Sequence, residues 1–269
     1  MEIPDLKNIY ICFPGGKHKV LTMSYDDGRP EDRRLVSIFN KHGIKGTFNL
    51  NGGLRCDDRI PPAEWPALYA GHEVASHTYL HPTIARSPLE QVAVQIMADR
   101  RALETAMGCP VRGLAYPNGS WSKEIAALLP ALGIRYARTV ESTGSFAMPE
   151  DFLAWPATCH HNRDLLARGE EFLALHKTQY LYMMYVWGHS YEFAQKDNWA
   201  LMEQFCEMMG GQEDIWYATN IQIVDYMADA KRLQFTANAD AVYNPNAQDI
   251  WLEVDKAHIR VPGGQLIKI

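Results

Sequence analysis

Residues 20–28 have the sequence Val-Leu-Thr-Met-Ser-Tyr-Asp-Asp-Gly, an apolar run that ends in two adjacent carboxylates and a glycine. Residues 20–24 are typical of a buried strand. Successive side chains of a strand point to opposite faces, so Asp26 and Asp27 can share one site only if the strand stops there. Gly28 permits that break. Because the catalytic residues of α/β barrels collect at the C-terminal ends of parallel strands, we expect both carboxylates at such a rim.

Strand-like and helical patterns alternate along the chain beyond this segment. Further strands are predicted at residues 46–51, 73–76, 111–116, 134–139, 180–187 and 215–219. Helices are predicted at residues 30–41, 62–69, 88–107, 122–129, 197–209 and 220–230. The alternation indicates parallel β-α units, and a length of 269 residues favours one barrel over two equal domains.

The sequence changes character after Lys231. Residues 233–269 contain short β-type runs separated by Asn-Pro and Pro-Gly-Gly turns, without a helical period. We therefore predict two parts, a barrel over residues 1–231 and a small β appendage over residues 232–269. The sequence leaves open whether this appendage packs on its own barrel or on a second copy of the chain in a homo-oligomer.

The composition argues against several classes of partner. A net charge of −6 and a pI near 5.9 give no electrostatic reason to expect nucleic acid or an anionic membrane. No apolar stretch approaches the roughly 18 residues of a membrane span, and Met1–Asp5 lacks a basic segment followed by an apolar one. The sequence thus predicts a cytoplasmic protein, although a signal peptide removed beforehand would leave the same residues. The five scattered cysteines form no C-x-x-C pair and are expected to be reduced.

Two histidines follow the strand predicted at residues 73–76. His77 and His81 have the i, i+4 spacing that places two imidazoles on one face of a helical turn, within reach of a single divalent ion. A carboxylate from Asp27 would complete a site with two histidines and one oxygen ligand. The alternative is a pair of surface histidines, which is the commoner origin of an H-x-x-x-H pattern taken alone.

Two more polar clusters follow predicted strands. Residues 115–119 read Ala-Tyr-Pro-Asn-Gly, and residues 187–189 read Trp-Gly-His. Together with the two earlier motifs, they resemble the polysaccharide deacetylase family of metal-dependent carbohydrate esterases. Its T-F-D-D-G motif corresponds to residues 24–28, its H-S/T-x-x-H motif to residues 77–81 and its late histidine motif to residues 187–189. The resemblance covers about residues 20–225 and implies a distorted (β/α)7-type barrel.

The resemblance also implies a role for each motif residue. Asp26 would be the catalytic base and His189 the general acid, while Asp27, His77 and His81 would bind one divalent ion. Zinc is favoured, and cobalt, nickel and iron suit the same ligands. Such an ion lowers the pKa of bound water from about 15.7 toward roughly 7, so that the water can attack an amide carbonyl at neutral pH.

The sequence departs from the family pattern in two motifs. The R-P-P-Y-G motif appears without the arginine that normally orients the base, and its candidate replacements are Arg112, Arg138 and Arg163. The D-x-x-D-W motif is not recognisable, although Trp155 lies in the right region and could form part of the groove wall. The remaining candidates for oxyanion or substrate contacts are Tyr116, Asn118 with its backbone N–H, Trp187, His160 and His161.

We therefore expect a hydrolase that removes an acetyl group from an N-acetylated sugar or oligosaccharide. Two alternatives stay open from the sequence. One is an amidase or cyclic imidase of the same fold that acts on a small non-sugar amide. The other is a catalytically idle carbohydrate-binding protein, against which the complete set of motif carboxylates and histidines argues.

Overall fold

The computed structural model describes residues 6–269, so the Met1–Asp5 segment used in the signal-peptide prediction lies outside the described residues. Its centre is a parallel sheet with the strand order β7-β6-β5-β4-β3-β2-β9-β8. These strands are β2 (Lys19–Asp26), β3 (Gly46–Leu50), β4 (Glu73–Ser76), β5 (Gly113–Ala115), β6 (Tyr136–Ser142), β7 (Trp155–Ala157), β8 (Cys159–His160) and β9 (Tyr182–Gly188). Every residue of β2 is buried, as expected for a strand covered on both faces.

The sheet curls until its two end strands become consecutive in the chain. β7 pairs with β6 and β8 pairs with β9, and only Thr158 separates β7 from β8. No ladder among residues 6–269 pairs β7 with β8, so hydrogen bonds do not close the barrel. When β7 and β8 are counted as one bent strand, seven strands surround the core. The predicted distorted (β/α)7 class is confirmed. A further strand, β10 (Ile215–Tyr217), pairs with the start of β2.

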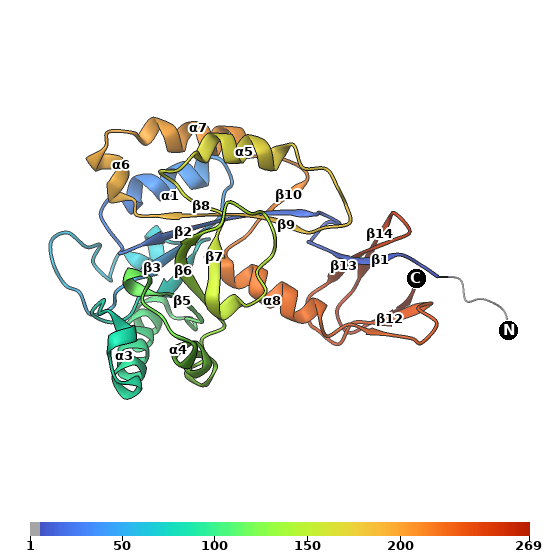
Figure 1. The fold of residues 1–269 in the computed structure, drawn as a ribbon, viewed down its shortest axis with the longest axis horizontal. Coiled ribbons are helices and arrows are strands. Elements are labelled where there is room, and N and C mark those ends of the chain that lie inside the picture. Colours follow the sequence, from blue (N-terminus) through green and yellow to red (C-terminus); the bar gives the residue numbers. More distant parts are fainter. Residues whose placement is uncertain (1–5) are drawn as a thin grey trace.

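Helices cover the outside of this sheet. Figure 1 shows α1, α5 and α7 on one side, with α3 and α4 on the other. The α-helices are α1 (Asp32–Lys41), α2 (Trp65–Leu68), α3 (Leu89–Met107), α4 (Lys123–Leu128), α5 (Leu165–Leu173), α6 (Tyr191–Gln195), α7 (Trp199–Met209) and α8 (Asn220–Ala230). The 3₁₀ turns are η1 (Ile84–Arg86), η2 (Pro117–Gly119), η3 (Leu129–Leu132) and η4 (Phe152–Ala154). None of the helices in residues 6–269 combines the length and apolar character needed to cross a membrane.

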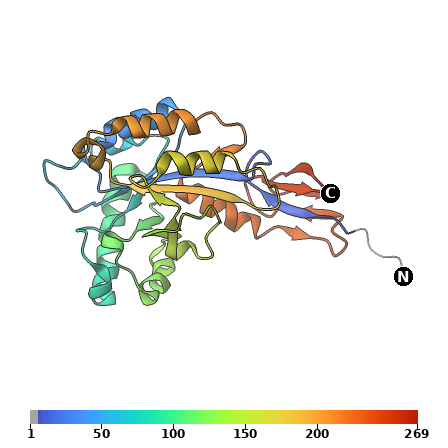
Figure 2. The same cartoon turned by 45° about the horizontal axis from the view of Figure 1, so that its top comes forward.

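The C-terminal segment forms short antiparallel strands beyond one end of the barrel (Figure 2). They are β11 (Gln234–Phe235), β12 (Ala241–Tyr243), β13 (Ile250–Val254), β14 (Ala257–Val261) and β15 (Leu266–Lys268). The N-terminal strand β1 (Ile9–Cys12) pairs with β13, so it lies in a sheet of the C-terminal segment although residues 1–231 were predicted to form the barrel. The buried side chains of Val242, Leu252, Val254 and Val261 form a small separate core there.

Trp155 lies on the strand segment that joins the two ends of the sheet. Its indole is fully buried and packs edge-on against Tyr136, Phe152 and Tyr185. The prediction that it forms part of a substrate groove is therefore wrong, because an enclosed ring cannot contact a ligand from solvent. Its contacts instead bring together β6, η4 and β9.

Trp155→Ala is expected to lower the free energy of unfolding by about 3–5 kcal/mol, because it leaves a cavity at this junction. Urea denaturation followed by circular dichroism would measure the loss. The matched control is Trp121→Ala, since Trp121 is 37% exposed and its removal leaves no enclosed cavity. Equal losses for the two variants would contradict the structural role assigned to Trp155.

Candidate active site

The three predicted metal ligands converge at the C-terminal ends of the strands. Asp27 follows β2, His77 follows β4, and His81 lies four residues farther along the chain. One ligand atom from each of the three lies within 4.8 Å of the other two. The Nε2 atoms of His77 and His81 are 3.1 Å apart, and His81 Nε2 is 4.0 Å from Asp27 Oδ1. This arrangement can hold one divalent ion.

The two histidines do not share a helical face, contrary to the sequence prediction. The segment between them is an irregular turn in which Thr78 and His81 have φ values of 64° and 57°. Asp27 also lies in the left-handed region, with φ at 83°. Non-glycine residues rarely adopt such angles, which cost on the order of 1–3 kcal/mol each and concentrate at functional sites. The surrounding structure must therefore hold these three residues in place.

Hydrogen bonds fix the orientation of the His77 ring and backbone. The ring Nδ1 lies 2.8 Å from the carbonyl oxygen of Ala115, so an N–H at this position leaves Nε2 free to face the other ligands. The backbone N–H of His77 donates to Asp99 of α3 at 3.1 Å. The same carboxyl accepts from the Ser76 hydroxyl and from the backbone N–H of Gly52. Asp99 was not predicted from the sequence, because it lies within a long helix and no motif marks it as part of a site.

Asp26 lies between the metal-ligand set and His189. Its Oδ2 is 3.9 Å from His77 Nε2 and 4.0 Å from His189 Nε2. Asn49 donates to its other oxygen at 2.8 Å, and the buried Arg138 guanidinium donates to Oδ2. Burial raises the pKa of Asp26, but the positive charge of Arg138 and the two imidazoles outweigh that effect and lower it to about 2. The carboxylate is therefore ionised at neutral pH.

Of the three arginines considered from the sequence, only Arg138 reaches Asp26. It comes from β6 and also stacks over the Trp187 ring at 4.6 Å. Arg112 instead forms two hydrogen bonds with Asp225 of α8, at 2.9 and 2.7 Å, which hold its guanidinium on that helix. Arg163 lies after β8 and lines a cavity next to the site. The base-orienting assignments of Arg112 and Arg163 are thus wrong.

His189 is held by a carboxylate that the sequence analysis did not identify. Glu192 of α6 lies three residues farther along, with Oε1 2.9 Å from His189 Nδ1. Its Oε2 is 3.1 Å from His161 Nε2, and His160 Nε2 lies 3.6 Å from Oε1. Burial lowers the pKa of His189, but hydrogen bonding to Glu192 and the charges of Asp26 and Asp27 raise it above its ordinary value overall. Glu192 therefore favours a protonated His189.

Comparison with known proteins agrees with this set of motifs. The sequence pattern described as "Polysaccharide deacetylase" matches residues 14–137. Over these residues the chain is similar to the polysaccharide deacetylase family. The chitooligosaccharide deacetylase of Azorhizobium caulinodans is 28% identical over 129 residues, which cover 48% of this chain and 56% of the relative. The enzyme of the same name from Sinorhizobium fredii is 29% identical over 121 residues, 44% of this chain and 50% of that protein. The chain thus spans about half the length of the curated relatives it matches.

Solved structures share this fold over more of the chain. A putative polysaccharide deacetylase from Mycobacterium smegmatis has a TM-score of 0.64 at 16% identity, covering 82% of this chain and 94% of its own. Puue allantoinase has a TM-score of 0.61 at 15% identity, covering 79% of this chain and 91% of its own. At these identities the similarity establishes the fold alone.

Some of the predicted substrate contacts are enclosed in the protein. Tyr116 is fully buried, stacks on Trp121, and donates its hydroxyl to the Leu153 carbonyl at 2.7 Å. His161 is fully buried and stacks against Phe193 and Tyr25. Neither side chain can contact a substrate, so these two assignments are wrong.

Other predicted contacts border an open cavity beside His189. The cavity has a volume of about 650 Å³, and His160, Arg163, Trp187 and Glu192 line it. Small-molecule sites commonly have volumes of about 300–1,000 Å³. The Trp187 indole N–H donates to Ser142 at 3.0 Å, which fixes its ring at the cavity wall. Asn118 lies in η2 with a left-handed backbone, and its side chain donates to Thr83 at 3.3 Å. The cavity is thus walled by residues from β6, β8, β9 and α6.

Arg138→Met is expected to lower the free energy of unfolding by about 3–5 kcal/mol, because it leaves the Asp26 carboxylate buried without its cation. Urea denaturation would measure this loss of stability. The double variant Asp26→Asn with Arg138→Met should recover part of the loss, since the unpaired charge is then absent. Arg112→Met is the matched control, because the partly exposed pair with Asp225 should contribute about 0–1 kcal/mol. Strictly additive losses in the double variant would contradict the pairing.

Proposed function

We propose that this chain is a metal-dependent hydrolase that removes an acetyl group from an N-acetylated sugar or oligosaccharide. The observation that carries the proposal is the position of Asp26, whose Oδ2 lies about equally far from His77 Nε2 and His189 Nε2, at 3.9 and 4.0 Å. A buried, ionised base thus stands between a set of metal ligands and a histidine that can donate a proton. Amide hydrolysis requires these three functions side by side.

The donor atoms of Asp27, His77 and His81 suit a single divalent ion. Two imidazole nitrogens and one carboxylate oxygen form a common catalytic zinc set, which leaves room for water or substrate. The Ala115 carbonyl holds His77 in the orientation that such ligands need. When bound, the ion supplies Lewis acidity, which polarises the amide carbonyl and lowers the pKa of water. We favour zinc, with cobalt, nickel and iron as alternatives.

Asp26 acts as the general base in this proposal. It accepts the proton of the attacking water as the new carbon–oxygen bond forms. Arg138 keeps Asp26 ionised, and Asn49 holds the other carboxylate oxygen, so Oδ2 is the oxygen directed at His77 and His189. The backbone N–H of Asn118 is proposed as a donor to the developing oxyanion, at a turn where Gly119 presents no side chain.

His189 acts as the general acid. The Glu192 carboxylate accepts a hydrogen bond from His189 Nδ1, so the opposite nitrogen, Nε2, is the one that faces Asp26 and the reaction centre. From that position Nε2–H protonates the leaving amine as the carbon–nitrogen bond breaks. Glu192 stabilises the imidazolium form that must be present before the transfer.

The adjacent cavity supports a substrate of small-molecule or oligosaccharide size. The largely buried Trp187 ring borders this cavity, and polar side chains line most of the remaining wall. Two relatives named chitooligosaccharide deacetylase agree with an N-acetylated sugar. A second candidate substrate is a small non-sugar amide or cyclic imide, favoured by the charged Arg163 and Lys196 in the same lining. These charges would suit an ionised small molecule.

Two neighbouring aspartates should separate metal binding from turnover. Asp27→Ala is expected to lower the metal content at this site, whereas Asp26→Asn should keep the metal and reduce kcat by at least about 10²-fold. Elemental analysis and amine release from a panel of acetylated sugars and cyclic imides would measure both. Near-normal turnover by Asp26→Asn would refute the assignment of the base. Stoichiometric metal without hydrolysis of any compound would favour the idle binding protein.

The rate should fall on the alkaline side as His189 loses its proton. Because hydrogen bonding to Glu192 raises the pKa of His189, Glu192→Gln should move this alkaline limb of kcat/KM to lower pH. The acidic limb should stay in place, since Asp26 keeps Arg138. Glu171→Gln is the control, because Glu171 pairs with Arg168 on an exposed helix surface. An alkaline limb that does not move in Glu192→Gln would contradict the pairing.

A further inference from the structure

A second group of metal-ligating side chains lies where the barrel meets the C-terminal strands. Cys12 ends β1, His18 directly precedes β2, and His258 lies in β14. The Cys12 sulfur and one ring nitrogen of each histidine all lie within 4.8 Å of one another. Glu253 of β13 is the cross-strand partner of His258 and points to the same cluster. A thiol and two imidazoles thus come together, and the Glu253 carboxylate contacts both imidazoles.

Three ligand-atom separations in this cluster are close to those around one metal ion. His18 Nε2 is 3.8 Å from Cys12 Sγ and 3.3 Å from Glu253 Oε2. His258 Nε2 is 3.5 Å from the same carboxylate oxygen. Zinc bonds of about 2.0–2.3 Å at tetrahedral angles place neighbouring ligand atoms roughly 3.3–3.7 Å apart. The three measured separations, 3.3–3.8 Å, lie close to this range.

The setting of Glu253 also calls for a cation. Its side chain is nearly fully buried, and no lysine or arginine of residues 6–269 lies within 4.0 Å of its carboxylate. A buried carboxylate is stable only when it is paired or binds a metal. The His258 ring packs closely against Gly16, whose φ is +76°. A Cβ at Gly16 would come within 2.6 Å of this ring, so the close contact requires glycine.

We propose that Cys12, His18, Glu253 and His258 form a structural zinc site that fastens the C-terminal strands to the barrel. Four protein ligands fill a tetrahedral shell and leave no position for substrate, as in structural zinc sites. A thiolate with two imidazoles selects a borderline-soft ion such as Zn²⁺ over Mg²⁺ or Ca²⁺. Cys12 binds as the thiolate, so one proton is released for each ion bound.

The location explains what such an ion would stabilise. Cys12 and His258 are 246 positions apart in the sequence, and β13 lies between β1 and β14, with which it pairs. The buried core beneath these strands is small, and metal ligation is a common way to stabilise a segment whose core is limited. The ion would therefore cross-link the first and last parts of the chain.

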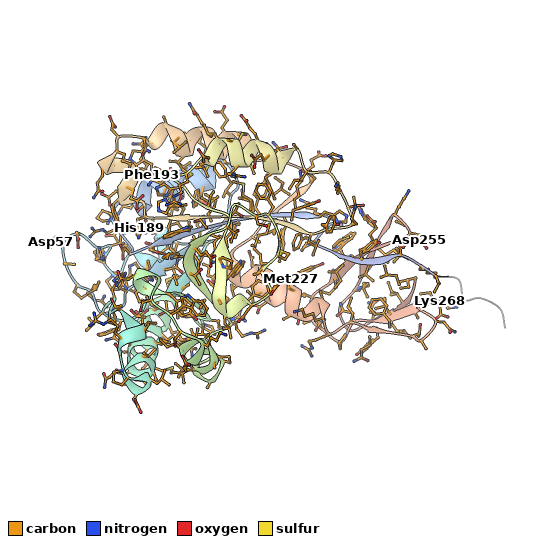
Figure 3. The ribbon with its side chains drawn as sticks, in the orientation of Figure 1. Asp57, His189, Phe193, Met227, Asp255 and Lys268 are labelled. Carbon is orange, nitrogen blue, oxygen red and sulfur yellow. The ribbon has the colours of Figure 1, made fainter. Side chains whose placement is uncertain are left out.

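This cluster is separate from the candidate active site. His18 precedes β2 and Asp27 follows it, so the eight residues of the strand keep the two sites roughly 25 Å apart. Figure 3 places His189 and the C-terminal Asp255 and Lys268 at opposite ends of the molecule. The two sites also differ in chemistry, because only the second one contains sulfur. That difference allows one to be observed without the other.

Cobalt substitution tests the proposal on the full chain. Co²⁺ bound by a thiolate gives a near-ultraviolet sulfur-to-cobalt charge-transfer band, which the oxygen and nitrogen ligands of the active site cannot produce. We expect this band in the wild-type protein and in Asp27→Ala, so the result does not depend on the proposed hydrolase activity. Cys12→Ser should lose the band and one equivalent of metal. Cys206→Ser is the control, since Cys206 is equally buried but lies in α7.

A second variant guards against misfolding of Cys12→Ser. The His258 side chain is 44% exposed, so His258→Gln should fold normally and keep the thiol, yet weaken cobalt binding at the sulfur site by roughly tenfold or more. Removal of the metal by a chelator should make residues 233–269 more sensitive to limited proteolysis in the wild type. A cobalt-saturated wild type without the band, or Cys12→Ser with unchanged band and metal content, would overturn the proposal. In that case Glu253 simply shares hydrogen bonds with two histidines.

Discussion

The buried ion pair between Asp26 and Arg138 is the interaction on which the site depends. A carboxylate at 2% exposure is stable in its charged form only because a cation lies against it. Arg138 is itself fully buried, stacks on Trp187, and its backbone carbonyl accepts the Tyr116 N–H at 2.9 Å. The pair therefore joins β2 and β6 across the barrel interior and fixes the cation against β9. Loss of either charge would leave the other without a partner inside the protein.

The sequence could locate the reacting groups but not all of their supports. Asp26, Asp27, His77, His81 and His189 each follow a predicted strand, and parallel strands necessarily bring such positions to one rim. The choice among three arginines depends on which face of a strand each one occupies. Arg138 is aligned with Ala115 of the neighbouring strand, and its side chain points into the barrel. A one-residue change in the phase of that strand would have directed it outward, and no spacing in the sequence reveals that phase.

In the fold as well, elements marked by local sequence patterns could be predicted, whereas a pairing between distant segments could not. Strand β4 and helix α8 have the predicted bounds, because apolar periodicity and turn residues mark them locally. Helix α5 was missed, since it is short and Gly169 interrupts its pattern. The pairing of β1 with β13 was also missed, because it joins residues about 240 positions apart and each strand alone resembles any short edge strand. The pairing between the two ends of the chain could not be predicted because the strands are far apart in the sequence, and not because their β propensity is weak.

The buried carboxyl groups near the site show why the partner, and not the residue type, decides the charge. Asp99 is as enclosed as Asp26, but its hydrogen-bond donors are a hydroxyl and two backbone N–H groups. Burial therefore dominates and raises the pKa of Asp99 to about 7, whereas Arg138 and the imidazoles bring that of Asp26 to about 2. Only Asp26 is fully ionised at neutral pH, and only its oxygen faces both His77 and His189. Asp99 instead holds the His77 backbone beside the strained turn, so one aspartate suits proton transfer and the other suits positioning.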